Sequence, residues 1–122
     1  MITQYITTSE GLTVIDDFRD GCWIKVVNPT DKEINLLVKR FGVWIEFFTD
    51  PLDLDERARF EVDEGNTLIL LRSPRREPEE AAIPYITLPI GMIFTGSVLI
   101  TVTLTEVDVL EEFVNGWVRN FD

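Results

Sequence analysis

The chain has 122 residues, enough for one compact domain with a hydrophobic core and too few for two ordinary domains. Its 22 acidic and 11 basic residues give a net charge of −11, which argues against nucleic acid as a partner because phosphate binding needs clustered Lys and Arg. The sequence has no His and one Cys, which excludes a disulfide framework, a Cys/His zinc site and His-dependent nucleophilic catalysis.

The acidity has two interpretations. A surface this negative repels other copies of itself unless cations accumulate on it, so self-association should respond to divalent ions. Alternatively, the charge only keeps the domain soluble. The first residues lack the basic and apolar regions of a secretory signal, and a lone thiol fits a reducing cytoplasm.

The first half of the chain predicts three strands and two helices. Residues 2–8, 12–15 and 22–27 have the composition of short strands. The segment "NPTDKEINLLVKRFG" predicts a helix, in which Thr30 and Glu33 form a capping box and Gly42 provides a left-handed stop. Its apolar face consists of Ile34, Leu37, Val38 and Phe41.

The next segment, "VWIEFFTDPL", predicts a shorter helix that ends near Asp50, because Pro51 disfavours helical geometry in the residue before it. Residues 58–62 and 67–73 then predict a hairpin joined by "DEGN". Residues 74–82 are charged and contain two prolines, which predicts an exposed loop.

Residues 81–105 carry no charge and are long enough to cross a bilayer. Prolines, glycines and the alternation of apolar residues with Thr after Val98 instead predict two paired strands with a turn at 95–97. Residues 106–116 predict a last helix. The six residues after it contain no helix cap and no turn, so we interpret the sequence as truncated. Interleaved strands and helices predict one α/β domain with a mixed parallel and antiparallel sheet covered by helices.

A stretch with five acids and no base lies between Phe41 and Arg57. Glu46 and Asp50 are four residues apart, so on a helix they share a face and repel each other. Asp50 also lies at a helix C-terminus, where the helix dipole adds a penalty of about 0.3–1 kcal/mol. The five acids are Glu46, Asp50, Asp53, Asp55 and Glu56.

A bound cation would relieve this repulsion, and carboxylate oxygens suit Mg²⁺ and Ca²⁺. The alternative is structural: Arg57 and Arg59 fold back, pair with the acids and fix the corner into the next strand. The spacing is not that of an EF-hand, because the required glycine would be Ala58.

Two further sets of residues are candidates for binding. The three tryptophans, Trp23, Trp44 and Trp117, are interpreted as core or interface anchors rather than ligand platforms. A basic patch could bind a phosphate or a partner's acids, or could be part of a solvated loop; it consists of Arg72, Arg75 and Arg76.

Three stretches in order resemble the amino-terminal cytoplasmic domain of CorA-type magnesium transporters: "GCWIKVVNPTDKEINLLVKRFGV", "FFTDPLDLDERARFEVDEGNTLILLRSP" and "ITLPIGMIFTGSVLITV". The most specific part is Asp50 followed, after Pro51, by "LDLDERARFE". The resemblance covers nearly the whole chain. It implies an α/β/α sandwich over residues 1–122, cut before a long connecting helix and the membrane helices.

The resemblance also implies a parent protein, a homopentameric membrane channel for Mg²⁺ and in some members Co²⁺ or Ni²⁺. The pore of that family carries a Gly-Met-Asn signature, which Gly91, Met92 and Ile93 do not match. Divalent ions between neighbouring cytoplasmic domains of the family hold the channel closed when internal Mg²⁺ is plentiful.

By the same resemblance the sensing aspartate is Asp50, and we expect Asp53 to support it as a second metal ligand. Thr49 stands where relatives often have an acid. The partner carboxylate is expected on the long helix, so metal occupancy in the isolated chain is expected to be low.

The leading hypothesis is therefore a non-enzymatic, Mg²⁺-sensing cytoplasmic domain of a CorA-like transporter in the cell membrane. Its partners would be neighbouring copies of itself, and it would reach the membrane only through carboxy-terminal helices. The alternative is a soluble acidic α/β module that binds a protein or small molecule and has no metal role. A hydrolase is a third hypothesis, because paired carboxylates can act as acid and base.

Overall fold

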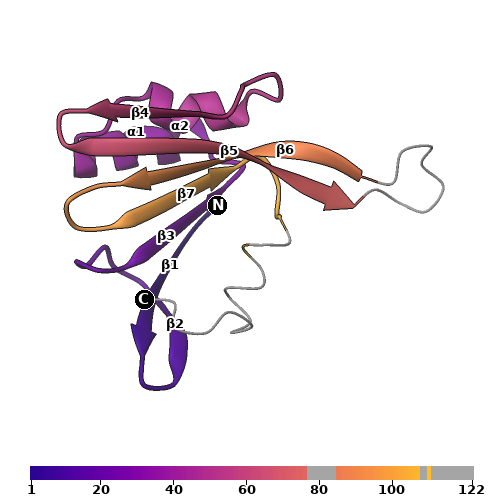
Figure 1. Cartoon of the computed structure of the whole chain (residues 1–122). Coiled ribbons are helices and arrows are strands. Elements are labelled where there is room, and N and C mark those ends of the chain that lie inside the picture. The colour runs from indigo at the N-terminus through magenta and orange to yellow at the C-terminus, as the bar shows by residue number, and fades with distance from the viewer. Residues whose placement is uncertain (77–84, 108–109, 111–122) are drawn as a thin grey trace.

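The computed structural model describes residues 1–76, 85–107 and 110. The strands of this part form one seven-stranded sheet in the order β2-β1-β3-β7-β6-β5-β4 (Figure 1). Strands β3 and β7 are parallel and the other neighbouring pairs are antiparallel, so the predicted mixed sheet is confirmed. The strands are β1 (Ile2–Thr8), β2 (Gly11–Ile15), β3 (Trp23–Val27), β4 (Arg59–Asp63), β5 (Asn66–Arg76), β6 (Tyr85–Phe94) and β7 (Leu99–Thr103).

Helix α1 (Asp31–Phe41) begins and ends where its capping residues predict. The Thr30 hydroxyl accepts a hydrogen bond from the Glu33 amide at 3.1 Å, and the Thr30 amide donates to Glu33 Oε1 at 2.9 Å. Gly42 has a φ of 66°, and its amide donates to the Val38 carbonyl at 2.9 Å. The predicted capping box and the predicted glycine stop are both confirmed.

The second predicted helix is divided into helix α2 (Glu46–Thr49) and a 3₁₀-helix, η1 (Asp50–Leu52). Asp50 keeps helical angles, φ −60° and ψ −41°, so the expected effect of Pro51 on that residue is wrong. The Asp53 amide donates to the Asp50 carbonyl at 3.0 Å. Pro51 needs no amide hydrogen inside this tighter turn, and its fixed φ suits helical geometry.

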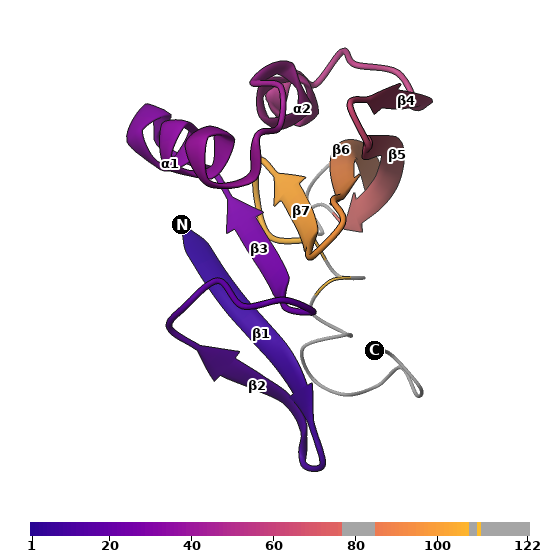
Figure 2. The ribbon, with the colours of Figure 1, turned by 90° about the vertical axis from the view of Figure 1, so that its left-hand side faces the viewer.

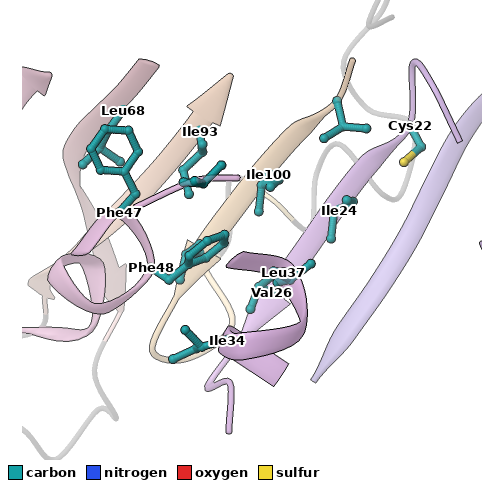
Figure 3. Close-up of a cluster of buried hydrophobic side chains, with 13 residues drawn as sticks. Cys22, Ile24, Val26, Ile34, Leu37, Phe47, Phe48, Leu68, Ile93 and Ile100 are labelled. Atoms are coloured by element: carbon teal, nitrogen blue, oxygen red, sulfur yellow. The ribbon is translucent and has the colours of Figure 1, made fainter. Parts of the chain in front are cut away.

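Both helices lie on the same face of the sheet (Figure 2). Strands β3 and β7 contribute Ile24, Val26 and Ile100 to the core between the layers, with Phe47 and Phe48 packed from α2 (Figure 3). A second apolar cluster lies on the opposite face, where the register places Trp23 and Leu99. The helix predicted over 106–116, and with it the second helical layer of the sandwich, lies mostly outside the described residues.

The predicted hairpins are present. Strands β4 and β5 are joined by Glu64 and Gly65, whose φ values of 48° and 84° are those of a two-residue hairpin turn. Strand β5 continues to Arg76, so the prediction that a loop begins at residue 74 is wrong. The pairing of β5 with β4 stops at Leu70, which leaves one edge of β5 open beyond it, and an open edge tolerates Pro74.

Candidate divalent-cation site

The acidic corner comprises residues 46–61 and connects the helical layer to the edge strand β4. Helix α2 and η1 bring the chain over β6, where Pro51 packs against the backbone. A Cβ built at Gly91 would lie 2.3 Å from Pro51 Cγ, so only glycine leaves room for η1 at this distance. The corner is therefore seated on the sheet and not on a free loop.

Asp50 forms an ion pair with Arg59 of the same chain. Its carboxylate oxygen Oδ2 accepts a hydrogen bond from Arg59 Nη2 at 2.5 Å, and the side chains of the two residues are 28% and 31% exposed. Arg59 also binds the carboxylate of Glu56 and contacts Glu61, with 3.4 Å between Arg59 Nε and Glu61 Oε2. One guanidinium thus supplies positive charge to three carboxylates.

The protonation of Arg59 reflects these contacts. Partial burial acts to lower the pKa of Arg59, but the hydrogen bond to Asp50 and the charges of Glu56 and Asp50 raise it above its ordinary value. The guanidinium is a permanent cation in any case. The alternative interpretation of the corner, in which basic residues fold back onto the acids, is thus confirmed for Arg59. Arg57 is exposed and makes no ion pair within the part of the chain that the structure describes.

Asp53 is exposed and has a local structural role. Its Oδ1 accepts a hydrogen bond from the Asp55 amide at 2.9 Å, while its carbonyl accepts one from the Glu56 amide at 3.0 Å. These bonds close the turn between η1 and β4. Asp50 and Asp53 therefore lie at the two ends of one short turn, as their sequence spacing requires. Glu46 is exposed one helical turn before Asp50, whose amide donates to the Glu46 carbonyl.

Arg72, on β5, holds the same turn against the sheet, a role that no pattern in the sequence indicates. Its Nη1 donates to the carbonyls of Leu54 and Glu56 at 3.0 and 2.7 Å. Its Nε and Nη2 donate to the hydroxyl and carbonyl of Thr87 at 2.9 and 3.0 Å. The guanidinium expected in a basic patch is therefore used inside the domain. Arg75 and Arg76 lie at the end of β5.

The tryptophans divide between core and surface. Trp23 is buried, stacks on Tyr5 with 5.0 Å between ring centroids and donates from Nε1 to the Thr101 hydroxyl at 2.9 Å. Trp44, between α1 and α2, is 49% exposed. Trp117 lies outside the described residues. The interpretation of Trp23 as a core anchor is thus confirmed.

In the described residues no three Cys, Asp or Glu side chains are arranged to hold a metal ion. The part of the chain described here likewise has no helix long and apolar enough to cross a membrane. Asp50 and Asp53 could offer carboxylate oxygens from this surface, but further ligands would have to come from water or from another surface.

Comparison with known proteins identifies the family. The sequence matches the family described as CorA-like Mg²⁺ transporter protein over residues 19–120, which is most of the chain. The chain belongs to this CorA-like family. Curated proteins gave no significant match.

Solved structures with this fold include CorA-like transporters. The complete CorA magnesium transporter from Methanocaldococcus jannaschii superposes with a TM-score of 0.75 at 22% identity, over 96% of this chain and 36% of that one. The soluble domain of the same protein gives 0.73 at 22% identity, over 94% and 45%. The ZntB cytoplasmic domain from Vibrio parahaemolyticus gives 0.69 at 15% identity, over 93% and 48%.

The CorA-like chain thus spans less than half the length of each of these structures. Because the identities are below 25%, these superpositions establish the shared fold alone. The shared fold confirms the predicted α/β class in a single domain with a mixed sheet, and the family match confirms the resemblance to CorA-type transporters.

Proposed function

We propose that this chain is the cytoplasmic regulatory domain of a CorA-like Mg²⁺ transporter, without enzymatic activity of its own. The observation that carries the proposal is the family match over residues 19–120, supported by the fold shared with a CorA soluble domain. The net charge of −11 is consistent with a surface that responds to cations.

The proposed ligands of the regulatory ion are Asp50 and Asp53. Both lie on one accessible turn, and the Asp50 side chain is 28% exposed although Arg59 holds its Oδ2. Mg²⁺ binds through one or two carboxylates and keeps several waters, so it can join two protein surfaces loosely. Mg²⁺ is the first candidate ion, with Co²⁺ and Ni²⁺ next, and occupancy in the isolated chain is expected to be low.

The proposed mechanism is electrostatic. In a homopentamer the acidic surfaces of neighbouring copies would face one another, and a bound divalent cation would neutralise them and favour the closed channel. When the ion leaves, repulsion between the surfaces would loosen the assembly and shift the population toward the open state. The domain would be connected to the membrane by helices that follow it in the longer protein.

The test uses the longer protein, extended through the connecting helix and the membrane segments. Thermal unfolding and light scattering are measured with and without Mg²⁺ for the unmodified protein, Asp50→Asn, Asp53→Asn and the control Asp16→Asn. Asp16 is an exposed acid outside the corner, so its substitution makes the same change of charge.

The quantity compared is the Mg²⁺-dependent increment in melting temperature, because Asp50→Asn also removes the partner of Arg59 and lowers stability directly. We expect Asp16→Asn to keep the increment of the unmodified protein, Asp50→Asn to lose it and Asp53→Asn to reduce it. An unchanged increment in Asp50→Asn would rule out the sensing role of this residue.

The second candidate function is a protein-interaction module with no metal role. The observation that favours it is Trp44, which is 49% exposed beside a surface hollow of about 510 Å³. The hollow is also lined by apolar Val38, Val43 and Ile45. Two results together would favour this module. The unmodified longer protein would show no Mg²⁺-dependent increment in melting temperature, and Trp44→Ala would abolish binding to a purified partner protein.

A further inference from the structure

Strand β4 forms one edge of the sheet (Figure 2). Its two-residue turn closes on the pair Asp63–Asn66, and the closing pair of such a hairpin is hydrogen-bonded. Hydrogen-bonded and non-hydrogen-bonded pairs then alternate along the two strands. Phe60 and Val62 belong to pairs of the second kind, so their amide and carbonyl groups point away from β5 and toward the open edge.

The edge segment, residues 57–63, separates charged from apolar side chains. Arg59 pairs with Asp50 of the helical layer, so the charged residues of β4 face the helices. Phe60 and Val62 face the other side of the sheet, where they are 67% and 58% exposed. The charges are also ordered by sign: a basic half, Arg57 and Arg59, precedes an acidic half, Glu61 and Asp63.

This order makes the edge segment complementary to itself. When two copies are laid antiparallel with their Phe60 residues opposite each other, the basic half of each copy lies opposite the acidic half of the other. Directly opposite residues share a face of the sheet, so unlike charges meet on one face and exposed apolar side chains meet on the other. The charged pairs are Arg57 with Asp63 and Arg59 with Glu61, each formed twice.

Other alignments of the two edge segments are poorer. Centring the pairing on Glu61 opposes two Glu61 side chains, and centring it on Val62 opposes Glu61 to Asp63. Like charges directly opposite each other are destabilising. Beyond the segment, the next pair would oppose Glu56 to Glu64, which confines the pairing to residues 57–63. The charges therefore select one register.

Arg57 and Asp63, the outermost residues of the segment, lack a counter-charge in the single chain. Neither forms an ion pair within the part of the chain that the structure describes. Desolvation and the charges of Glu64 and Glu61 raise the pKa of Asp63. Arg59 and Glu61, by contrast, already contact each other within one chain. The outermost pair therefore gains most from a second copy.

We propose that the outer edge of β4 pairs with the same edge of a second copy, so that two domains share one continuous sheet through their edge segments. The pairing extends β4 by Arg57 and Ala58, which directly precede it. The contact has two-fold symmetry, so it differs from the head-to-tail contacts that would close the proposed homopentamer. It stands whether or not the domain senses Mg²⁺.

The experiment exchanges the charges of the outermost pair in the 122-residue chain. Sedimentation is measured over a range of protein concentrations at physiological salt, where repulsion between chains of net charge −11 is screened. The samples are the unmodified chain, Arg57→Glu, Asp63→Lys, the two substitutions in one chain, and an equimolar mixture of the two single variants. Val14→Lys is the control, because Val14 is 64% exposed on β2, the other edge strand.

The unmodified chain should associate as its concentration rises. Each single substitution should raise the dissociation constant of the dimer about tenfold or more, because it opposes like charges at two places. The doubly substituted chain and the mixture should both recover association, because unlike charges are opposite again, and Val14→Lys should have little effect. Net charge alone cannot produce this pattern: the single substitutions change it from −11 by two units, to −13 and −9, so general repulsion would make Asp63→Lys associate more strongly.

Three results would overturn the proposal. The first is an unmodified chain that sediments as a monomer at every concentration. The second is a loss of association in the single variants that the mixture does not recover, and the third is an equal loss in Val14→Lys. Should Asp63→Lys fail to fold, hydrogen exchange of the unmodified chain decides the question: the amides of Phe60 and Val62 must exchange more slowly as the dimer forms, and unchanged exchange overturns the pairing.

Discussion

Replacing Arg59 by Met should destabilise the domain and should do so through the acidic corner. The substitution removes the guanidinium from Asp50, Glu56 and Glu61 and leaves three carboxylates without this shared cation. An exposed ion pair contributes about 0.2–1 kcal/mol, and a hydrogen bond to a charged group about 1.5–3 kcal/mol. These side chains are between a quarter and about a third exposed, so we expect a total loss of about 2 kcal/mol.

The loss is measured as the change in the free energy of unfolding in urea. Arg57→Met is the matched control, because Arg57 lies two residues away, is exposed and makes no ion pair in the described part of the chain. Its substitution should change stability by less than about 0.5 kcal/mol. High salt should weaken the difference between the two variants only partly, because partly buried pairs are screened less than exposed ones.

A double-mutant cycle then identifies the partner. Asp50→Asn and Arg59→Met together should cost less than the sum of the single substitutions, by about 1 kcal/mol, since both remove the same contact. Equal costs for Arg57→Met and Arg59→Met, or strict additivity of Arg59→Met with Asp50→Asn, would refute the assignment of Arg59 as the internal counter-charge of the corner.

Three further changes should follow from the packing and capping contacts. Gly91→Ala should cost about 1–3 kcal/mol in urea unfolding, because its methyl group would overlap Pro51, and Pro51→Ala in the same chain should recover part of the loss. Thr30→Ala should cost about 1 kcal/mol by removing the cap of α1. The pKa of Glu33 is lowered, first by the hydrogen bond from the Thr30 backbone amide. A lowered folded-state pKa gives stability that is present above the unfolded pKa and is lost as pH falls through the folded value. Glu33→Gln should therefore flatten the loss of stability in acid, measured as unfolding free energy against pH.

The first and the last of these predictions have clear contrary outcomes. A Gly91→Ala chain as stable as the unmodified one would mean that η1 can move away from β6. Equal acid sensitivity with and without the Glu33 carboxylate would mean that the capping box contributes nothing to the pH dependence.

Local signals in the sequence were enough to predict α1. Thr30, Glu33 and Gly42 act within one turn of the helix ends, and their bonds depend on no residue far away in the chain. The β4–β5 turn is a second case, because a Gly that accepts positive φ lies between two strand patterns. Such features are set by neighbours in sequence, so a pattern of a few residues determines them.

Long-range contacts explain what could not be predicted. The end of β5 depends on which strands pair with it, and the rule that a proline ends a strand does not hold where one edge is open. The role of Arg72 depends on the turn at 53–56 lying over β5. Arg72 contacts Leu54 and Glu56, which precede it in the sequence by 18 and 16 positions. No periodicity in the sequence carries that information.

In the candidate site, one part could be predicted from the sequence and another part could not. The excess of acid around Asp50 is visible in the sequence, and so is the need for a positive charge near it. Which cation supplies that charge is decided by the fold, because Arg59 is nine residues away and reaches Asp50 only after η1 turns the chain back toward β4. If Asp50 binds the regulatory ion proposed above, that ion must share the carboxylate with Arg59 or displace it, and Arg59→Met should make the Mg²⁺-dependent increment of the longer protein larger. A smaller increment in that variant would mean that Arg59 positions the carboxylate for the ion rather than competing with it.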